Sequence, residues 1–299
     1  MFTIISSFLL STTLAWAELP KQPTDRSHPS SGVYLYGHKQ ETIQISGRKV
    51  TVFLPVPAQT TTEKFPVIVF GHGQAIDVLG YELTFKHLAQ KGIAVIHPTF
   101  DSGFFDQDWH RMAADFNSLA AGAIKKYSDV MDANKIVYSG HSKGGYVALM
   151  AAGAPGLIQA GIKPSALLLF APADYDRDYL NNVDPSIPVT VVWSDNDTVI
   201  KQSVITDIYA GLKSKNKQWI LVKSYSELKA DHFFPLSKSY FFGGQNGLTA
   251  YHYFATWKWL TAAAFDLQSE NPLSNSFIYG TETSSTGVVG VEHTVTKNW

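Results

Sequence analysis

Ser142 has the strongest chemical context in the sequence, because it stands at the centre of a Gly-x-Ser-x-Gly pattern running from Gly140 to Gly144. The β-branched run 135–138 precedes the pattern and the small-residue stretch 148–153 follows it, which predicts a buried strand and a helix. A serine on so sharp a strand-to-helix turn has strained dihedral angles, and glycines beside it avoid collisions. The context predicts a nucleophile beside the N–H groups of a helix N-terminus.

A serine nucleophile needs a base to take its proton and an acid to orient that base. In an α/β sheet with this turn, the partners follow in the order serine, acid, histidine, at the carboxyl ends of later strands. His232 is the candidate base, since it follows the last predicted buried strand and comes 90 residues after Ser142. Three acids are candidates, because Asp195 and Asp197 follow one predicted strand and Asp174 follows the strand before it.

Three other histidines are expected to have structural roles. His72 lies in the turn after the first buried strand, where its side chain would order the loop. His141 is the neighbour of Ser142 and is expected to point away from the serine hydroxyl. His252 lies in a helical stretch rich in aromatic residues and is expected to pack within it.

The elements that must position these residues form an α/β pattern. Residues 42–45 and 49–53 alternate around Ser46-Gly47, which predicts an N-terminal antiparallel hairpin. Continuous apolar runs then alternate with helical patterns, as expected for a mostly parallel central sheet with helices on both faces. The predicted strands after the hairpin are 66–70, 93–96, 135–138, 167–170, 189–193 and 219–222; the predicted helices are 81–90, 111–127, one between the last two strands and one after Gly247.

Two backbone N–H groups are expected to form an oxyanion hole, those of Lys143 after the nucleophile and of Gln74 after the first buried strand. The side chain of Lys143 is expected to be a solvated charge at the mouth of the pocket. Aromatic residues on loops at the carboxyl edge of the sheet would wall the pocket and favour an apolar acyl or alcohol group. These candidates are Phe104, Phe105, Trp109, Tyr175 and Phe233.

Composition and charge exclude several classes of protein. The chain has 299 residues, of which 45% are hydrophobic and 16% charged, so it can bury a large core. Its 24 basic and 25 acidic residues show no basic excess that would attract nucleic acid. The absence of cysteine excludes disulfides, thiolate metal sites and a cysteine nucleophile. No cluster has metal-ligand spacing, and neither a metal nor another cofactor is expected.

The chain resembles the α/β-hydrolase superfamily over residues 43–267. The segment 140–145 resembles the nucleophile turn of chlorophyllases, dienelactone-hydrolase-like esterases and bacterial polyester hydrolases of the cutinase or PET-hydrolase type. The segment 195–199 resembles the acid loop of the polyester hydrolases, in which the aspartate before threonine is catalytic, and 231–233 resembles their histidine loop. The resemblance therefore implies Asp197 as the acid, with Asp195 and Asp174 as the alternatives.

The sequence also departs from those relatives. Dienelactone hydrolases proper use a cysteine, and polyester hydrolases carry an aromatic residue and a tryptophan where this chain has Gln74 and Ala173. His72-Gly73 instead resembles the His-Gly of lipases and chlorophyllases. No long insertion separates Phe170 from Pro188, so no large cap domain is expected.

The termini are expected to lie outside the hydrolase domain. Residues 1–17 resemble a signal peptide, with an apolar stretch and the small-x-small site Ala15-Trp16-Ala17, and they are too short to span a membrane. The expected location is therefore secreted or periplasmic, with no integral membrane span. Residues 18–32 would be an extended leader, 33–268 the hydrolase domain, and 269–299 a C-terminal extension that is packed, strand-forming or flexible.

Together these features predict a monomeric, secreted serine hydrolase that cleaves a small-molecule or lipid-like carboxylic ester. A peptidase, an amidase or a lipase could use the same three residues, so these alternatives remain open. A binding protein on a hydrolase scaffold is the alternative from a different class, and the complete set of serine, acid and histidine argues against it.

Overall fold

The structure is a computed structural model that describes residues 21–26, 28–103, 105–154, 161–224, 228–238, 240, 243–244, 246–266, 283–284, 287–288 and 293–298. The predicted signal peptide at 1–17 lies outside these residues, as does Phe104, one of the predicted pocket residues.

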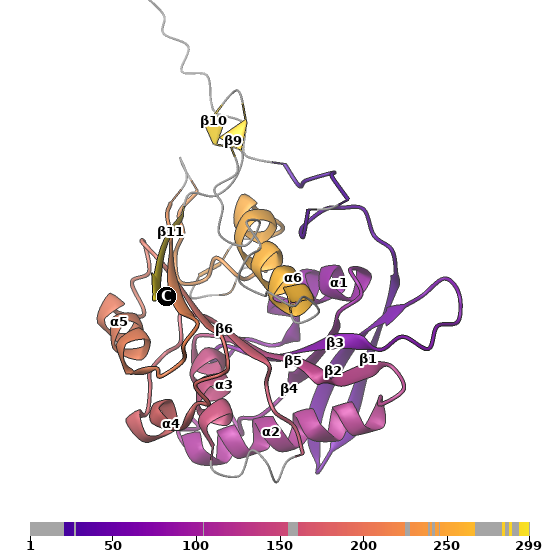
Figure 1. The fold of residues 1–299 in the computed structure, drawn as a ribbon, viewed down its shortest axis with the longest axis horizontal. Coiled ribbons are helices and arrows are strands. Elements are labelled where there is room, and N and C mark those ends of the chain that lie inside the picture. Colours follow the sequence, from indigo (N-terminus) through magenta and orange to yellow (C-terminus); the bar gives the residue numbers. More distant parts are fainter. Residues whose placement is uncertain are drawn as a thin grey trace, which may run out of the picture.

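Within the described residues, nine strands form one mixed sheet with the order β1-β2-β4-β3-β5-β6-β7-β8-β11 (Figure 1). The six strands from β4 to β8 in this order are parallel, whereas β2 is antiparallel to both of its neighbours and β11 is antiparallel to β8. The strands are β1 Gly37–Ile45, β2 Arg48–Val56, β3 Phe65–Gly71, β4 Ala94–Pro98, β5 Met131–His141, β6 Ala166–Phe170, β7 Val189–Ser194, β8 Lys217–Val222 and β11 His293–Asn298.

Helices cover both faces of the sheet (Figure 1). Helices α1 and α6 pack on one face, and α2, α3, α4 and α5 pack on the other. This arrangement confirms the predicted α/β-hydrolase fold class with its N-terminal antiparallel hairpin. The helices are α1 Glu82–Gln90, α2 Trp109–Lys126, α3 Lys143–Gly153, α4 Arg177–Asn182, α5 Gln202–Gly211 and α6 Trp257–Asp266, with a 3₁₀ turn η1 at Val78–Gly80 and a π-helical turn η3 at His252–Thr256.

Alternate side chains of each central strand enter two separate apolar cores. In β5, Ile136 and Tyr138 face the α2–α5 layer, whereas Val137 faces α1 and α6. Both sets are fully buried. Because successive side chains of a strand point to opposite faces, a strand covered on both sides is apolar at nearly every position. This explains the continuous apolar runs in the sequence.

The two ends of the described chain pack against the sheet and its helices. The segment 28–31 is buried, where the Ser30 hydroxyl donates to the carbonyl of Tyr253 and His87 Nε2 donates to the carbonyl of Pro29 at 3.3 Å. At the other end, β11 pairs with β8 in the register Val295–Ile220, while β9 (Thr283–Ser284) and β10 (Gly287–Val288) form a separate pair. The predicted leader thus contacts the core through its last residues, and the predicted extension contains a strand of the main sheet.

The segment between β6 and β7 contains one short helix, α4, which is not among the helices predicted from the sequence. No helix in the described part of the chain combines the length and the apolar character needed to cross a membrane.

Candidate active site

Ser142 lies at the junction of β5 and α3 with a φ of 56° and a ψ of -121°. A residue other than glycine in such a conformation costs about 1–3 kcal/mol, so the surrounding structure must hold it. The N–H of Ser142 donates to the carbonyl of Phe170 at 2.9 Å, and its carbonyl accepts from the N–H of Ala173 at 3.1 Å. Phe170 of the neighbouring strand β6 and Ala173 of the loop after it therefore hold the two peptide units on either side of the Ser142 side chain.

Two glycines allow the backbone to approach closely at this turn. A Cβ on Gly144 would lie 2.1 Å from the carbonyl carbon of Gly71, and a Cβ on Gly140 would lie 2.4 Å from the carbonyl oxygen of Gly144. Either substitution would collide with main chain, which cannot rotate aside as a side chain can. The first turn of α3 is thereby placed directly against the carboxyl end of β3.

His232 and Asp197 form a buried pair, although they are 35 residues apart in sequence. His232 Nδ1 donates to Asp197 Oδ2 at 2.9 Å, and the exposed fractions of the two side chains are 3% and 0%. The other carboxylate oxygen, Oδ1, accepts from the N–H groups of Val199 and Ile200, both at 2.8 Å. These bonds fix the orientation of the carboxylate, which in turn fixes the orientation and the tautomer of the imidazole.

The two alternative acids have other partners. Asp195 accepts from the N–H and the hydroxyl of Ser224, at distances from 2.7 to 3.0 Å, and so joins the loops after β7 and β8. Asp174 accepts from the N–H of Tyr175 at 2.9 Å. Of the three candidates, Asp197 is the one whose carboxylate contacts the histidine.

The two predicted oxyanion donors lie on adjoining turns. Gln74 follows β3 and precedes Ala75, which has a φ of 59°. Lys143 is the first residue of α3. The backbones of Gly71 and Gly144 are in direct contact, so the turn after β3 and the start of α3 lie side by side. This junction is the proposed oxyanion corner. Backbone N–H groups at such a corner can converge on a developing oxyanion.

The side chain of His72 orders the turn after β3, as the sequence predicted. Its Nδ1 donates to the carbonyl of Gly73 at 3.0 Å, and its ring stacks on Phe100 with a centroid distance of 4.4 Å. Burial lowers the pKa of His72 below its ordinary value, although the carboxylate of Asp101 opposes this shift. The ring is therefore held in a fixed orientation beside the proposed oxyanion corner.

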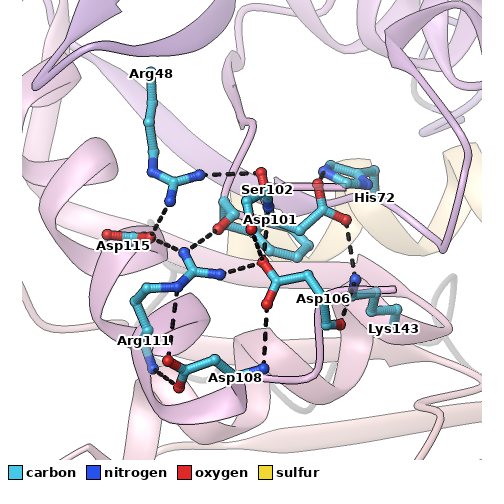
Figure 2. A network of polar contacts seen from close by, with 10 residues as sticks. Arg48, His72, Asp101, Ser102, Asp106, Asp108, Arg111, Asp115 and Lys143 are labelled. Atoms are coloured by element: carbon cyan, nitrogen blue, oxygen red, sulfur yellow. Dashed lines mark hydrogen bonds and ion pairs between the residues drawn. The ribbon is translucent and has the colours of Figure 1, made fainter. Parts of the chain in front are cut away.

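The prediction that the Lys143 side chain is a solvated charge is wrong. The ammonium group is buried, with 2% of the side chain exposed, and it donates to Asp101 Oδ2 at 3.0 Å and to the carbonyl of Asp106 at 3.2 Å (Figure 2). The loop between β4 and α2 folds over the start of α3 and supplies both acceptors. Because an unpaired buried charge is costly, the lysine holds this loop against the turn at Ser142.

A wider ionic network holds the same loop (Figure 2). Arg111 of α2 bridges Asp106 and Asp115, and Arg48 of β2 contacts Asp115 at 3.1 Å. Although burial favours the neutral form of Asp106, hydrogen bonds from Ser102 and Arg111 hold its pKa below the ordinary value. The carbonyl and the carboxylate of Asp106 thus connect Lys143 to Arg111, and Asp115 connects Arg111 to Arg48.

We expect Lys143→Met to lower the free energy of unfolding by about 3 kcal/mol or more, because it leaves Asp101 with an uncompensated charge in a largely buried place. Chemical denaturation at neutral pH measures this loss. Lys163→Met is the matched control, since Lys163 pairs with Asp184 at 2.7 Å at the surface, where 60% of the lysine side chain is exposed. The control should lose less than about 1 kcal/mol. Equal losses in the two variants would contradict the structural role of Lys143.

Two of the predicted pocket residues lie beside the site. The ring of Phe233 contacts that of His232 edge-on, with a centroid distance of 5.0 Å. Trp109 packs against Tyr146 at 4.9 Å, and Lys143 Nζ lies 5.8 Å from its ring centroid. These two aromatic residues therefore border the loop that carries His232 and the turn at Ser142.

The other two described candidates are placed differently. Phe105 is 87% exposed, so it lies at the surface. Tyr175 donates its hydroxyl to Asp207 of α5 at 3.1 Å and packs against the apolar core. Tyr175 therefore stabilises the loop after β6.

A cavity of about 560 Å³ adjoins the turn after β3. Its lining includes Ile76 and Val78 from that turn, His72 and His97 from the ends of β3 and β4, and Asp101. A larger cavity of about 800 Å³ lies at the amino ends of β6 and β7. The smaller one is the candidate for substrate binding, because it lies at the carboxyl ends of the strands, where ligands of parallel sheets bind. Its lining reaches His72 and Ala75 on either side of Gln74 and does not include Ser142 or His232. Across the described residues, no group of three or more His, Cys, Asp or Glu side chains is arranged to hold a metal ion.

Sequence reasoning did not single out Asp101 or Tyr81, which both contact the site. Asp101 comes three residues after β4, and its position beyond the carboxyl end of a parallel strand was a usable signal. Tyr81 contacts His141 across 60 residues, and nothing in the local sequence indicates this pair.

A family model described as Chlorophyllase matches residues 33–222. The match covers more than half of the chain, including Ser142, Lys143 and Asp197, and it ends before His232. No curated protein matches the chain.

Proposed function

Since the chain belongs to the chlorophyllase family, which indicates an ester hydrolase of the α/β-hydrolase type, we propose that it cleaves carboxylic esters with Ser142, His232 and Asp197. The observation that carries this proposal is the hydrogen bond of 2.9 Å from His232 Nδ1 to Asp197 Oδ2. This bond places the proton on Nδ1 and leaves the lone pair of Nε2 able to accept a proton from serine. The strained turn that presents Ser142 supports the same assignment.

The proposed reaction has two halves. His232 Nε2 removes the proton from Ser142 as the serine oxygen attacks the ester carbonyl, and the N–H groups of Gln74 and Lys143 stabilise the resulting oxyanion. When the tetrahedral intermediate collapses, the imidazolium donates its proton to the departing alcohol, which leaves an acyl group on Ser142. Water, activated by His232, then attacks the acyl carbonyl and releases the acid. Asp197 stabilises the imidazolium in both halves.

The proposed substrate is a small-molecule or lipid-like ester with a modest apolar acyl or alcohol group. The cavity beside the turn after β3 supports this, because Ile76 and Val78 offer apolar wall close to the proposed oxyanion corner. Phe233 and Trp109 add aromatic surface near His232 and Lys143. The single short helix between β6 and β7 leaves this part of the site without a large cap.

A series of p-nitrophenyl esters from acetate to palmitate tests the proposal. Each methylene that the pocket buries is worth about 0.8 kcal/mol, so kcat/KM should rise about fourfold per carbon while carbons still contact the wall, and then level off. We expect the optimum between butyrate and octanoate, without a lag phase. p-Nitroanilides of the same acids serve as matched amide controls and should react much more slowly. Equal or faster anilide hydrolysis, or activity confined to emulsified long-chain triglycerides, would contradict the proposal.

A further inference from the structure

A continuous chain of hydrogen bonds links the turn after β3 to the histidine loop. The N–H of Gly73 contacts the hydroxyl of Tyr81 at 3.0 Å, this hydroxyl contacts His141 Nδ1 at 2.9 Å, and His141 Nε2 contacts the carbonyl of His232 at 2.8 Å. Tyr81 and His141 are almost completely buried, with exposed fractions of 1% and 0%. Three segments that are distant in sequence therefore meet through two side chains.

The direction of each bond follows from the chemistry of its partners. A carbonyl can only accept, so His141 Nε2 carries a proton and donates to His232. Burial is the main cause that lowers the pKa of His141 well below its ordinary value, and the nearby His232 lowers it further. The His141 ring is therefore neutral, and its Nδ1 has a free lone pair. The Tyr81 hydroxyl donates to that lone pair, and its oxygen accepts from Gly73. Every donor in the chain thus has one acceptor.

The fit around this chain is close. A Cβ on Gly73 would lie 3.1 Å from His141 Nδ1 and 3.3 Å from the Tyr81 hydroxyl oxygen, and 2.8 Å from the end of the Ile76 side chain. The ring of His141 lies 4.7 Å from that of His232, measured between centroids. The ring of Tyr81 also packs against Phe70 and Phe85, and these contacts restrict the movement of the side chain.

The chain of hydrogen bonds contacts or adjoins the backbone of each proposed catalytic group. Gly73 precedes Gln74, whose N–H is proposed to bind the oxyanion, and His141 precedes the nucleophile Ser142. The carbonyl that accepts from His141 belongs to His232, the proposed base. A change in any one link would therefore shift the oxyanion donor relative to the base.

We propose that Tyr81 and His141 are positioning residues that hold the oxyanion turn and the catalytic histidine in register on either side of Ser142. This inference rests on the proposed function. Neither side chain touches the substrate or takes part in proton transfer. Their effect is on the geometry of groups that act in the transition state, in which a displacement of about 1 Å can cost about 10²-fold in rate.

The variant Tyr81→Phe tests the proposal, because it keeps the ring and removes the hydroxyl. Gly73 then loses its acceptor and His141 Nδ1 loses its donor. We expect kcat on p-nitrophenyl butyrate to fall between about tenfold and 10²-fold, with KM within about twofold of wild type, since the lost register affects the oxyanion more than the bound ester.

The matched control is Tyr138→Phe. Its hydroxyl is also buried and donates to Asn117 Oδ1 at 2.7 Å, but this bond lies on the opposite face of the sheet. The control should lower the midpoint of thermal unfolding by a similar amount and leave kcat and KM unchanged. Equal kcat values for the two variants, or a Tyr81→Phe effect confined to KM, would overturn the proposal.

A second readout does not depend on ester hydrolysis. In ¹⁵N-histidine NMR spectra at neutral pH, His141 should be neutral with its proton on Nε2, and its Nδ1 resonance should move in Tyr81→Phe and not in Tyr138→Phe. A proton on Nδ1, or an Nδ1 resonance unaffected by Tyr81→Phe, would overturn the proposal. If wild-type protein cleaved no ester, the proposed function would fail. The tautomer of His141 would still show whether the hydrogen bonds from Gly73 to His232 form.

Discussion

Replacing Ser142 with alanine is expected to lower kcat on p-nitrophenyl butyrate by about 10⁵- to 10⁶-fold while the protein stays folded. In the proposed mechanism the variant has no nucleophile, so any residual rate over water would come from the oxyanion donors and from substrate binding. The main-chain bonds that clamp the turn, from Ser142 N–H to Phe170 and from Ala173 N–H to Ser142, are retained. Steady-state kinetics and thermal unfolding of the same preparation measure the two effects.

Ser139→Ala is the matched control for this substitution. Ser139 lies in β5, the strand that leads to Ser142, is fully buried, and donates its hydroxyl to the carbonyl of Leu168 at 2.5 Å. Loss of that bond should lower the free energy of unfolding by about 1 kcal/mol and leave kcat within a few-fold of wild type. A Ser142→Ala variant that kept a tenth of wild-type kcat would contradict the assignment.

Asp197→Asn is expected to lower kcat about 10⁴-fold without unfolding the protein. The amide of the new side chain donates a hydrogen bond to Nδ1 of His232, so the ring proton moves to Nε2, which can no longer accept the proton of serine. The asparagine carbonyl can still accept from Val199 and Ile200, so the loop should keep its conformation. Steady-state kinetics on the same ester, with circular dichroism as the check on folding, measures the effect.

Asp195→Asn is the control that separates the orientation of His232 by Asp197 from the mere loss of a negative charge in the loop after β7. Asp195 is two residues away and accepts from Ser224, so its substitution should leave kcat within about tenfold of wild type. If Asp195→Asn were the more damaging of the two variants, with both folded, the acid would be misassigned.

Much of the fold could be predicted because its signals are local. A parallel strand covered on both faces is apolar at nearly every position, and this property marks β3, β4 and β6 in the sequence. The turn at Ser142 is also a local signal, since the glycines at 140 and 144 are required by contacts with the adjacent backbone. The N-terminal hairpin follows in the same way from alternation around Ser46-Gly47.

What the sequence did not reveal depends on contacts between distant segments. The environment of Lys143 is set by Asp101, which is 42 residues earlier and lies on a loop with no regular structure to indicate its path. The Tyr81–His141 contact likewise joins two elements whose separation is known only once the sheet is assembled. The pairing of β11 with β8 was not predicted either, because Thr-rich and Val-rich residues near a chain end fit several structures.

The choice among the three candidate acids depends on both local sequence signals and contacts between distant segments. Parallel strands β6 and β7 bring Asp174, Asp195 and Asp197 to the same edge of the sheet, and position in sequence alone left all three as candidates. The path of the loop after β7 turns the Asp197 carboxylate toward His232 and the Asp195 carboxylate toward Ser224. Family resemblance had implied Asp197, and the hydrogen bond to the histidine supports that choice.

The most direct test of the central claim is to label the native protein with a fluorophosphonate, which reacts with an activated serine, and to map the modified residue by peptide mass spectrometry. The proposal predicts one modified residue, Ser142, in the folded wild-type chain, no labelling after heat denaturation, and no labelling of Ser142→Ala. The rate of labelling should also fall in Asp197→Asn and not in Asp195→Asn. Labelling at a different serine, or labelling that persists in Ser142→Ala, would contradict the claim that Ser142 is the nucleophile.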